Sequence, residues 1–253
     1  MFLDVMTWFG LLVLPAFMVL DLIRRRRKFD APRGWRLRAF VVSVGVFFLS
    51  LKVGELWGAW TGGWALLDGA VLGTVGGAVA GILVYEFFHY AYHRTAHRSD
   101  LLWRAAHQMH HSAESLDAFG ANYLHPGDVF FFTSIASITF VPLLGLTAEA
   151  SAIANAFLAF NAAFQHADVK TPRWLGYIVQ RPESHLLHHA RGVHRYNYSD
   201  LPLWDIVFGT FRNPATCDAE VGFYNGASAR VGEMLVGRDV TRPRDRELAA
   251  ARN

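Results

Sequence analysis

The sequence has one cysteine, little charge and no motif for an organic or haem cofactor. Cys217 is the single cysteine, which excludes an intramolecular disulfide framework and any cysteine-based zinc or iron–sulfur site. No G-x-G-x-x-G follows a strand pattern, and we find no haem, iron–sulfur or nucleic-acid motif. Nucleic acid is therefore not an expected partner, and any electrons that the protein uses must come from a separate protein.

Apolar and aromatic residues are abundant in the chain. Charged residues make up 18% of the chain, below the usual quarter or so, whereas hydrophobic residues make up 53%. The mean hydropathy is positive, and the chain has 20 Phe and 8 Trp. This composition is typical of a protein that faces lipid, and the length of 253 residues predicts a single domain.

Long apolar runs predict the fold class. A bilayer core of about 30 Å needs about 20 apolar residues in a helix, with a range of about 17–25. Five runs approach that length: residues 2–23, 39–60, 64–85, 129–146 and 148–164. We predict an all-α, multi-span transmembrane bundle of about five spans, with a cytosolic, histidine-rich helical cap that binds metal. Residues 1–84 would hold the N-terminal spans, 85–211 the catalytic region and 212–253 a C-terminal tail. From residue 227 to 253 we expect this tail to extend over the surface.

A basic cluster predicts the topology. Arg24 to Lys28 follow the first apolar run, with Arg33, Arg36 and Arg38 just beyond, and such clusters stay cytoplasmic. A signal peptide would carry its charge before the apolar run, so we interpret residues 2–23 as an anchor. Counting spans from this loop brings every histidine group to the cytoplasmic side. We expect an integral, multi-pass protein of a bacterial inner membrane.

Two local patterns predict contacts inside the bundle. Lys52 and Glu55 lie three residues apart in the second run, so they share a helix face and can neutralise each other. Glycines recur at three- and four-residue spacings in the third run, a pattern typical of close helix packing in lipid: Gly69, Gly73, Gly76, Gly77 and Gly81.

All twelve histidines lie between His89 and His194. Most form three groups: His89, His93 and His97; His107, His110 and His111; and His185, His188 and His189 with His194 just beyond. His125 and His166 stand alone between the groups. Neutral imidazole is the commonest protein ligand for transition metals, so this concentration predicts a histidine-ligated metal site.

The spacings predict two metal ions. On a helix, positions i, i+3 and i+4 share a face while adjacent positions diverge by about 100°. Each H-x-x-H-H motif, at residues 107–111 and 185–189, can thus offer ligands to two ions. With His93 and His97 this gives eight imidazoles, too many for one ion, because a tetrahedral zinc takes four ligands. Imidazole also suits iron, copper and nickel, so ligand type alone leaves the metal open.

Several segments, in order, resemble the sterol desaturase / fatty acid hydroxylase family. Residues 92–97 (YHRTAH) resemble its Y/W-x-H-R-x-x-H, residues 102–112 (LWRAAHQMHHS) its L-W-x-x-x-H-x-x-H-H-S, and residues 181–189 (RPESHLLHH) its T-P-x-x-H-x-x-H-H. The His-Pro at 125–126, the segment 164–169 (FQHADV), Asn-Tyr at 197–198 and the segment 203–210 (LWDIVFGT) are similar to further family elements. Arg181 replaces the Thr and Ser199 a Gly of the family pattern. The likeness covers about half of the chain.

The resemblance implies an oxygen-dependent, non-haem di-iron enzyme of lipid metabolism, a membrane-bound hydroxylase or desaturase. It would take a lipid from the bilayer, two Fe ions, O2 as co-substrate and electrons from a separate reductase or ferredoxin-type donor. The resemblance carries the metal ligands over to His93, His97, His107, His110, His111, His166, His185, His188 and His189, with His125 as a further ligand. His89, His194 and Asp205 are expected to support the ligands from outside.

Two other function classes stay open. A membrane zinc-dependent hydrolase needs a carboxylate base in the motif, as in H-E-x-x-H, and none of these motifs has one. A histidine-rich metal-binding or transport protein would place its histidines inside the spans, whereas the predicted spans leave them outside. Within the oxidase interpretation, hydroxylation and desaturation are equally compatible with the spacing, and the substrate could be sterol-like, hopanoid, carotenoid or fatty-acyl.

Overall fold

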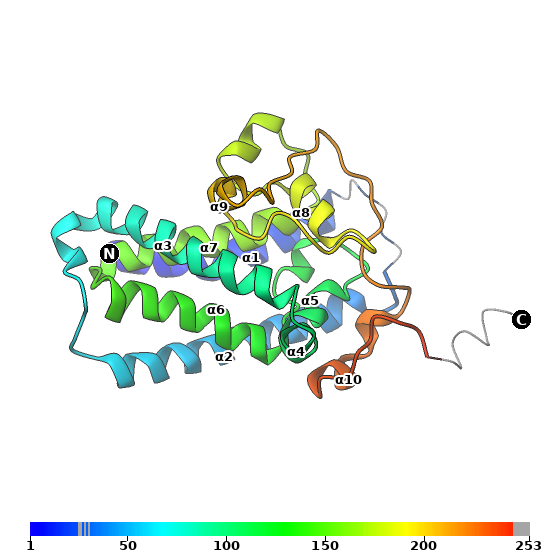
Figure 1. The fold of residues 1–253 in the computed structure, drawn as a ribbon, viewed down its shortest axis with the longest axis horizontal. Helices are drawn as coiled ribbons and strands as arrows, with labels where there is room; N and C mark the ends of the chain where they lie inside the picture. The colour runs from blue at the N-terminus through cyan, green and yellow to red at the C-terminus, as the bar shows by residue number, and fades with distance from the viewer. Residues whose placement is uncertain (25–26, 28, 30, 245–253) are drawn as a thin grey trace, which may run out of the picture.

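The computed structural model describes residues 1–24, 27, 29 and 31–244, and these form an all-helical protein (Figure 1). Within them the extended structure is limited to one isolated bridge between Ala190 and Val221. The α-helices are α1 (Phe2–Ile23), α2 (Trp35–Thr61), α3 (Gly73–Ala96), α4 (Asp100–Leu102), α5 (Gln108–His111), α6 (Pro126–Ile138), α7 (Ala148–His166), α8 (Pro182–His189), α9 (Pro202–Val207) and α10 (Val231–Leu235). Short 3-10 turns cover Gly69–Leu72, Ala118–Gly120, Arg173–Tyr177 and Ala227–Ala229, and π-helical turns cover Trp103–His107 and Thr139–Leu143.

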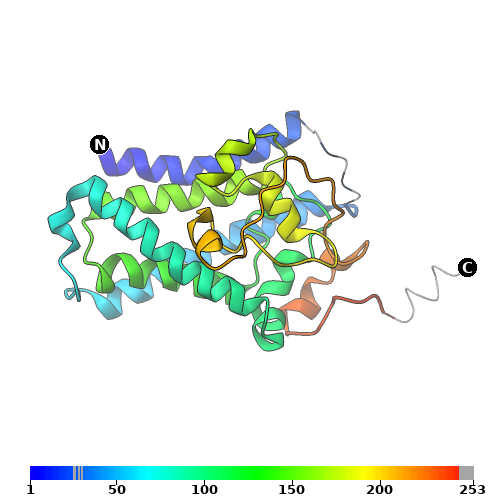
Figure 2. The same ribbon diagram turned by 45° about the horizontal axis from the view of Figure 1, so that its top comes forward.

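The long helices run along the long axis of the molecule, and the short helices α4, α5 and α10 gather at the end away from the N-terminus (Figures 1 and 2). Helix α1 packs on α7, α2 packs on α6, and α3 contacts both α6 and α7. Local sequence sets the boundaries: Thr147 accepts a hydrogen bond from the Ala150 N–H to cap α7, and Pro126 occupies the first turn of α6.

In the described part of the chain, four helical segments are long and apolar enough to cross a membrane: Phe2–Ile23, Trp35–Thr61, Gly69–Ala96 and Pro126–Leu143. The expected fifth run does form a helix, α7, but this helix is not among the four. Its sequence is rich in alanine and carries Asn155, Asn161 and Gln165, and it packs between α1 and α3 inside the bundle. The all-α, multi-span prediction is confirmed, and the number of candidate spans is four.

The third apolar run ends later than the sequence pattern predicts. We expected the span to stop near Tyr85 and the histidines to lie beyond it. Instead α3 continues to Ala96, because no glycine or proline interrupts the helix after Gly81. His89 and His93 therefore lie on the last turns of a candidate span. A span that is continuous with the first histidine group holds that group rigidly.

The two local contact predictions are tested directly. Lys52 Nζ lies 2.7 Å from a carboxylate oxygen of Glu55, so the expected pair forms, but both side chains are exposed and the pair does not lie inside the bundle as predicted. A Cβ on Gly77 would lie 3.0 Å from the Ala150 Cβ, and one on Gly81 would lie 2.7 Å from a Leu146 methyl. Close packing of α3 through its glycines is confirmed at these two positions; Gly73 faces open space.

The C-terminal tail, as far as it is described (to residue 244), is not the surface extension that its charge and weak periodicity predict. Ala227, Met234 and Val240 are fully buried, and the last two join a core cluster that contains Trp35 of α2 and Met109 of α5. Glu114 fixes the start of this segment by accepting the N–H groups of Gly226 and Ser228. The prediction was wrong because a few apolar residues, spaced without period, suffice to fill this gap. The basic residues Arg25, Arg26 and Lys28 lie outside the described residues.

Candidate metal centre

Nine imidazoles converge in two adjacent groups where α3, α5, α7 and α8 meet. The first group contains His93, His97, His107, His111 and His188, and the second contains His110, His166, His185 and His189. Within each group the candidate ligand atoms all lie within 4.8 Å of one another. All nine side chains are buried except that of His97, which is half-buried. Nine of the ten histidines expected to bind metal are thus brought together.

The two H-x-x-H-H motifs are each divided between the groups. His107 and His111, four residues apart, face the first group, while His110 faces the second. In α8 the arrangement is mirrored, because His185 and His189 face the second group and His188 the first. Trp103–His107 forms a π-helical turn, which shifts the ring of His107 relative to a regular helix. Helical periodicity places these ligands as the spacing predicts.

The distances between ring nitrogens fit a bound metal ion. His185 Nε2 lies 3.2 Å from His166 Nε2 and 3.0 Å from His189 Nε2. Two nitrogens bound to one ion at about 2.1 Å with a right angle between them would be about 3.0 Å apart. In the first group, the Nε2 atoms of His93, His97 and His188 are buried and have no hydrogen-bond partner among the described residues. Native proteins rarely leave buried nitrogens unpaired, so both groups fit metal ions.

Hydrogen bonds from outside the groups fix which nitrogen faces inward. The Nδ1 of His93 lies 2.7 Å from the Tyr198 carbonyl oxygen, and the Nδ1 of His188 lies 2.7 Å from that of Tyr196. Because a carbonyl oxygen only accepts, each Nδ1 must carry the proton, which leaves the Nε2 lone pair free to bind. His166 is fixed in the same way by the Ala162 carbonyl at 2.9 Å.

The loop that supplies these carbonyls has an unusual backbone. His194, Tyr196 and Asn197 have positive φ angles of 41°, 70° and 51°. Such conformations cost on the order of 1 kcal/mol or more each and persist where surrounding contacts enforce them. The Asn197 side chain donates hydrogen bonds to the Ser184 and Arg212 carbonyls, and these contacts hold the loop in this conformation. The strain is thus located in the loop that orients two imidazoles.

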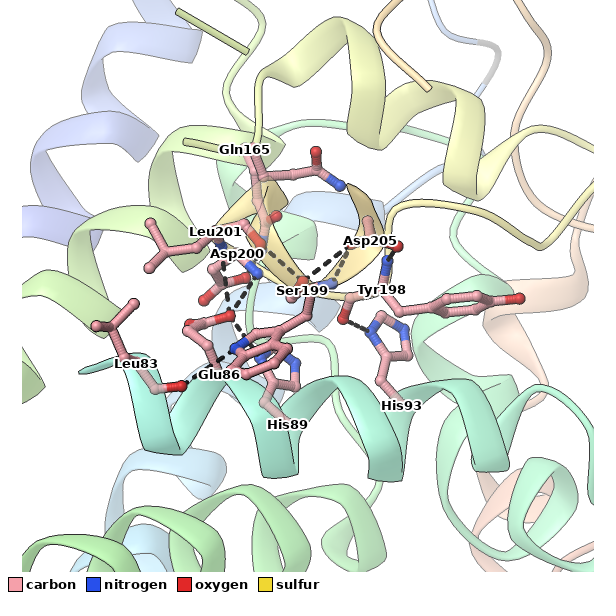
Figure 3. A network of polar contacts seen from close by, with 12 residues as sticks. Leu83, Glu86, His89, His93, Gln165, Tyr198, Ser199, Asp200, Leu201 and Asp205 are labelled. Atoms are coloured by element: carbon pink, nitrogen blue, oxygen red, sulfur yellow. Dashed lines mark hydrogen bonds and ion pairs between the residues drawn. The ribbon is translucent and has the colours of Figure 1, made fainter. Parts of the chain in front are cut away.

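Asp205 acts on the imidazoles through this loop. It accepts hydrogen bonds from the N–H groups of Tyr198 and Ser199 and from the Thr210 hydroxyl. It thereby holds the Tyr198 carbonyl against His93 (Figure 3). Asp205 therefore positions His93 through the Tyr198 backbone and not by direct contact with its imidazole.

Burial keeps the imidazoles neutral. It lowers the pKa of the ligand histidines outside the candidate spans well below their usual range, and in each case the other imidazoles lower it further: His97, His110, His111, His185, His188 and His189. A neutral ring keeps the lone pair that a metal ion requires.

Three further histidines lie outside the two groups. The structure does not bring His125 to either one: its Nδ1 accepts the Gly127 N–H at 2.9 Å and so caps α6, which explains the His-Pro pair without a metal. His194 Nδ1 lies 3.0 Å from His111 Nδ1, which agrees with a supporting role. Burial lowers the pKa of His194 to about 4. The ring of His89 stacks on that of His93 at 5.6 Å.

Sequence reasoning missed two carboxylates near His89. Glu86, His89 and Asp200 form a third group whose candidate ligand atoms lie within 4.8 Å of one another. Burial, together with the neighbouring Glu86 carboxylate, raises the pKa of Asp200 to about 7. Glu86 lies one residue beyond the span expected from the sequence but inside the candidate span of the structure, where an ionisable residue usually has a function. Nothing in the sequence places Asp200 beside it.

A cavity of about 900 Å³ leads to the two groups. Its wall on α7 extends from Ser151 to His166, a rise of about 22 Å along the helix. At one end it is lined by Met6 of α1 and Trp57 of α2, and at the other by His93 and imidazoles of both groups. The wall between these ends is mainly apolar, which suits a long hydrocarbon chain.

Asp128 provides the first test of this geometry. Its carboxylate lies 2.8 Å from His107 Nδ1 and accepts the Tyr92 hydroxyl at 2.6 Å, and it is fully buried. We expect Asp128→Asn to lower metal affinity about 10- to 100-fold, because the amide no longer fixes the ring. Metal retention during chelator titration measures this. Tyr92→Phe, which spares the carboxylate, is the control; equal retention by Asp128→Asn and wild type would refute the role.

Comparison with known proteins points the same way as the geometry. The family model described as Fatty acid hydroxylase matches residues 78–210, just over half of the chain. The curated relatives include the ornithine lipid hydroxylase OlsE of Rhizobium tropici, 31% identical over 54% of this chain and 42% of its own. Sphinganine C4-monooxygenase 1 of Arabidopsis thaliana is 26% identical over 53% of both chains. Human alkylglycerol monooxygenase is 35% identical over 50% of this chain and 28% of its own.

These matches cover only part of each relative. The chain spans between 28% and 53% of the length of these three proteins. All three are named as hydroxylases or monooxygenases. The part of the chain that the family model matches, residues 78–210, includes every imidazole of both groups. No solved structure matches the chain.

Proposed function

Because the chain belongs to the fatty acid hydroxylase family, we propose that it is a membrane-bound, oxygen-dependent di-iron enzyme that oxidises a C–H bond of a lipid. The observation that carries the proposal is the position of the two imidazole groups, side by side at one end of a mainly apolar cavity. Hydroxylation is the favoured outcome, since the relatives are named for it, and desaturation is the alternative.

We assign one iron ion to each imidazole group. His93, His97, His107, His111 and His188 would hold the first, and His110, His166, His185 and His189 the second. Bound iron would supply the activation of O2, with two electrons from a separate reductase or ferredoxin-type protein. The chain's own part is to hold the rings through the Tyr196, Tyr198 and Ala162 carbonyls and Asp128. The buried site also excludes bulk water from the oxidant.

The donor set favours an oxidase over a hydrolase. Among the described residues, neither imidazole group includes a carboxylate, so no general base lies within them. We also propose that the metal end is cytoplasmic and that the membrane is a bacterial inner membrane, from the basic residues after α1. A lipid would then reach the cavity from the bilayer, and the electron donor would reach the cap from the cytoplasm.

The decisive experiment is metal analysis of the purified protein together with oxygen-dependent lipid oxidation. We expect Mössbauer spectra of a coupled iron pair and uptake of one oxygen atom from ¹⁸O₂ into a lipid when a reductant is supplied. A tightly bound zinc pair, after expression with ample iron and without oxygen uptake, would refute the proposal in favour of hydrolysis. Protein without metal above background would refute it altogether.

Blocking the cavity should separate lipid binding from metal binding. Ala159 of α7 lines the cavity and is half-buried. We expect Ala159→Trp to lower lipid oxidation at least about 10-fold, because the indole fills space that the hydrocarbon chain needs. Metal content should not change. Ala159→Ser, which keeps the cavity open, is the control, and full activity of Ala159→Trp would show that the lipid takes another path.

A further inference from the structure

A carboxylate pair lies beside the metal centre and is not part of it. Glu86 and His89 come from α3, and Asp200 comes from the loop before α9 (Figure 3). Their exposed fractions are 0%, 8% and 6%. His89 and Asp200 line the cavity, and Glu86 lies directly behind them. The group therefore forms a polar wall at the metal end of a mainly apolar cavity.

The hydrogen bonds of this group are incomplete. One oxygen of Glu86 accepts the N–H groups of Asp200 and Leu201 at 2.8 and 3.3 Å, and Asp200 accepts a hydrogen bond from Gln165 at 2.9 Å. The other Glu86 oxygen and His89 Nδ1 are buried without a hydrogen-bond partner among the described residues. Buried polar atoms rarely stay unpaired, so one such atom on the cavity wall, in His89, and another just behind it, in Glu86, indicate a site for a ligand.

The charge of the group selects the kind of ligand. Two carboxylates, Glu86 and Asp200, lie in one buried group, and buried charges need a positive group beside them. His89 Nδ1 lies 3.8 Å from a Glu86 carboxylate oxygen, so this imidazole offsets one of the two charges when it is protonated, and the other charge is left without a cation. Of the described residues that line the cavity, none is Lys or Arg. A ligand that brings a positive charge and several N–H donors would satisfy both the charge and the open acceptors. A primary ammonium has three donors, which match the two carboxylates and the imidazole nitrogen.

We propose that Glu86, His89 and Asp200 bind the ammonium group of an amine-bearing lipid. This proposal rests on the proposed function and names its substrate class. The lipid would lie with its head at the metal end and its hydrocarbon chain along α7 toward Met6 and Trp57. His89 precedes His93 by one helical turn, a rise of about 6 Å, so the oxidised carbon lies within a few bonds of the carbon that bears the amine.

Binding of two matched probes tests the proposal without catalysis. We would measure equilibrium binding of radiolabelled hexadecylamine and hexadecan-1-ol to the full chain in detergent. Wild type should bind the amine on the order of 10-fold tighter or more, because hydrogen bonds to charged groups contribute about 1.5–3 kcal/mol. Asp200→Asn and Glu86→Gln should each abolish this preference and leave alcohol binding within about twofold. Equal binding of both probes by wild type overturns the proposal.

Glu114→Gln is the matched control. Like Glu86, Glu114 is buried, accepts two backbone N–H groups with one oxygen and leaves the other unpartnered, but it does not line the cavity. Its loss should leave the amine preference intact. If Glu114→Gln also abolished the preference, the effect would be general charge and the proposal would fall.

Metal analysis of the same samples separates the remaining outcomes. A third metal ion per chain that is lost in Asp200→Asn would make the group a metal site and overturn the proposal. An amine preference without bound iron or lipid oxidation would refute the proposed function and leave this site standing. Bound iron and lipid oxidation without an amine preference would support the proposed function and refute the ammonium site. If both carboxylate variants fail to fold, the wild-type preference alone decides.

Discussion

Replacing His188 by alanine is expected to remove one of two bound metal ions and to lower lipid oxidation by more than about 100-fold. The magnitude follows because loss of a mere supporting partner already costs about 10- to 100-fold, and His188 is itself a member of the first group. His185→Ala, one helical turn earlier on α8, should remove the other ion, since His185 faces the second group. Iron content by mass spectrometry and Mössbauer spectra distinguish the two losses.

His125→Ala is the matched control for both variants. It makes the same chemical change at a histidine that caps α6 and belongs to neither group. We expect full metal content and a loss of about 1 kcal/mol or less in the free energy of unfolding. Retention of both ions by His188→Ala would refute the assignment of that residue, and loss of an ion in His125→Ala would return His125 to the ligand set.

The convergence of the histidines could be expected from the sequence because most of them repeat at helical spacing. That one H-x-x-H-H motif can serve two sites followed from its spacing, since adjacent positions of a helix point in different directions. His166 followed from the family resemblance, not from spacing. The helical runs were predicted for the same reason, although α3 continues past the expected end at Tyr85.

What the sequence did not predict depends on contacts between distant segments. Asp200 meets Glu86 across 114 residues, and no local pattern signals that contact. The Tyr198 carbonyl reaches His93 only because a loop adopts positive φ angles, which residues such as Tyr196 rarely show. His125 was expected to bind metal because its side chain type suits a ligand, whereas its position before Pro126 suits a helix cap equally well.

Arg181→Met is expected to destabilise the protein by about 3–5 kcal/mol, the cost of leaving a buried charge unpaired. Arg181 stands where the family pattern has Thr and immediately precedes α8, and its side chain is fully buried. Its guanidinium lies 3.1 Å from the buried Glu183 carboxylate and donates to Thr171, Asn213 and Pro214. Removal leaves Glu183 without its cation. Because α8 carries three metal-facing histidines, metal content should fall with stability.

Unfolding in mixed detergent micelles, followed by tryptophan fluorescence, measures the effect. Arg191→Met is the control: that arginine pairs with Glu220 at 2.6 Å, but the two side chains are 39% and 78% exposed. Exposed pairs contribute about 0–1 kcal/mol, so this change should be small. Adding Glu183→Gln to Arg181→Met should recover part of the loss, since the double variant buries no unpaired charge. If Arg181→Met costs no more than Arg191→Met, the Arg181–Glu183 pair does not hold α8.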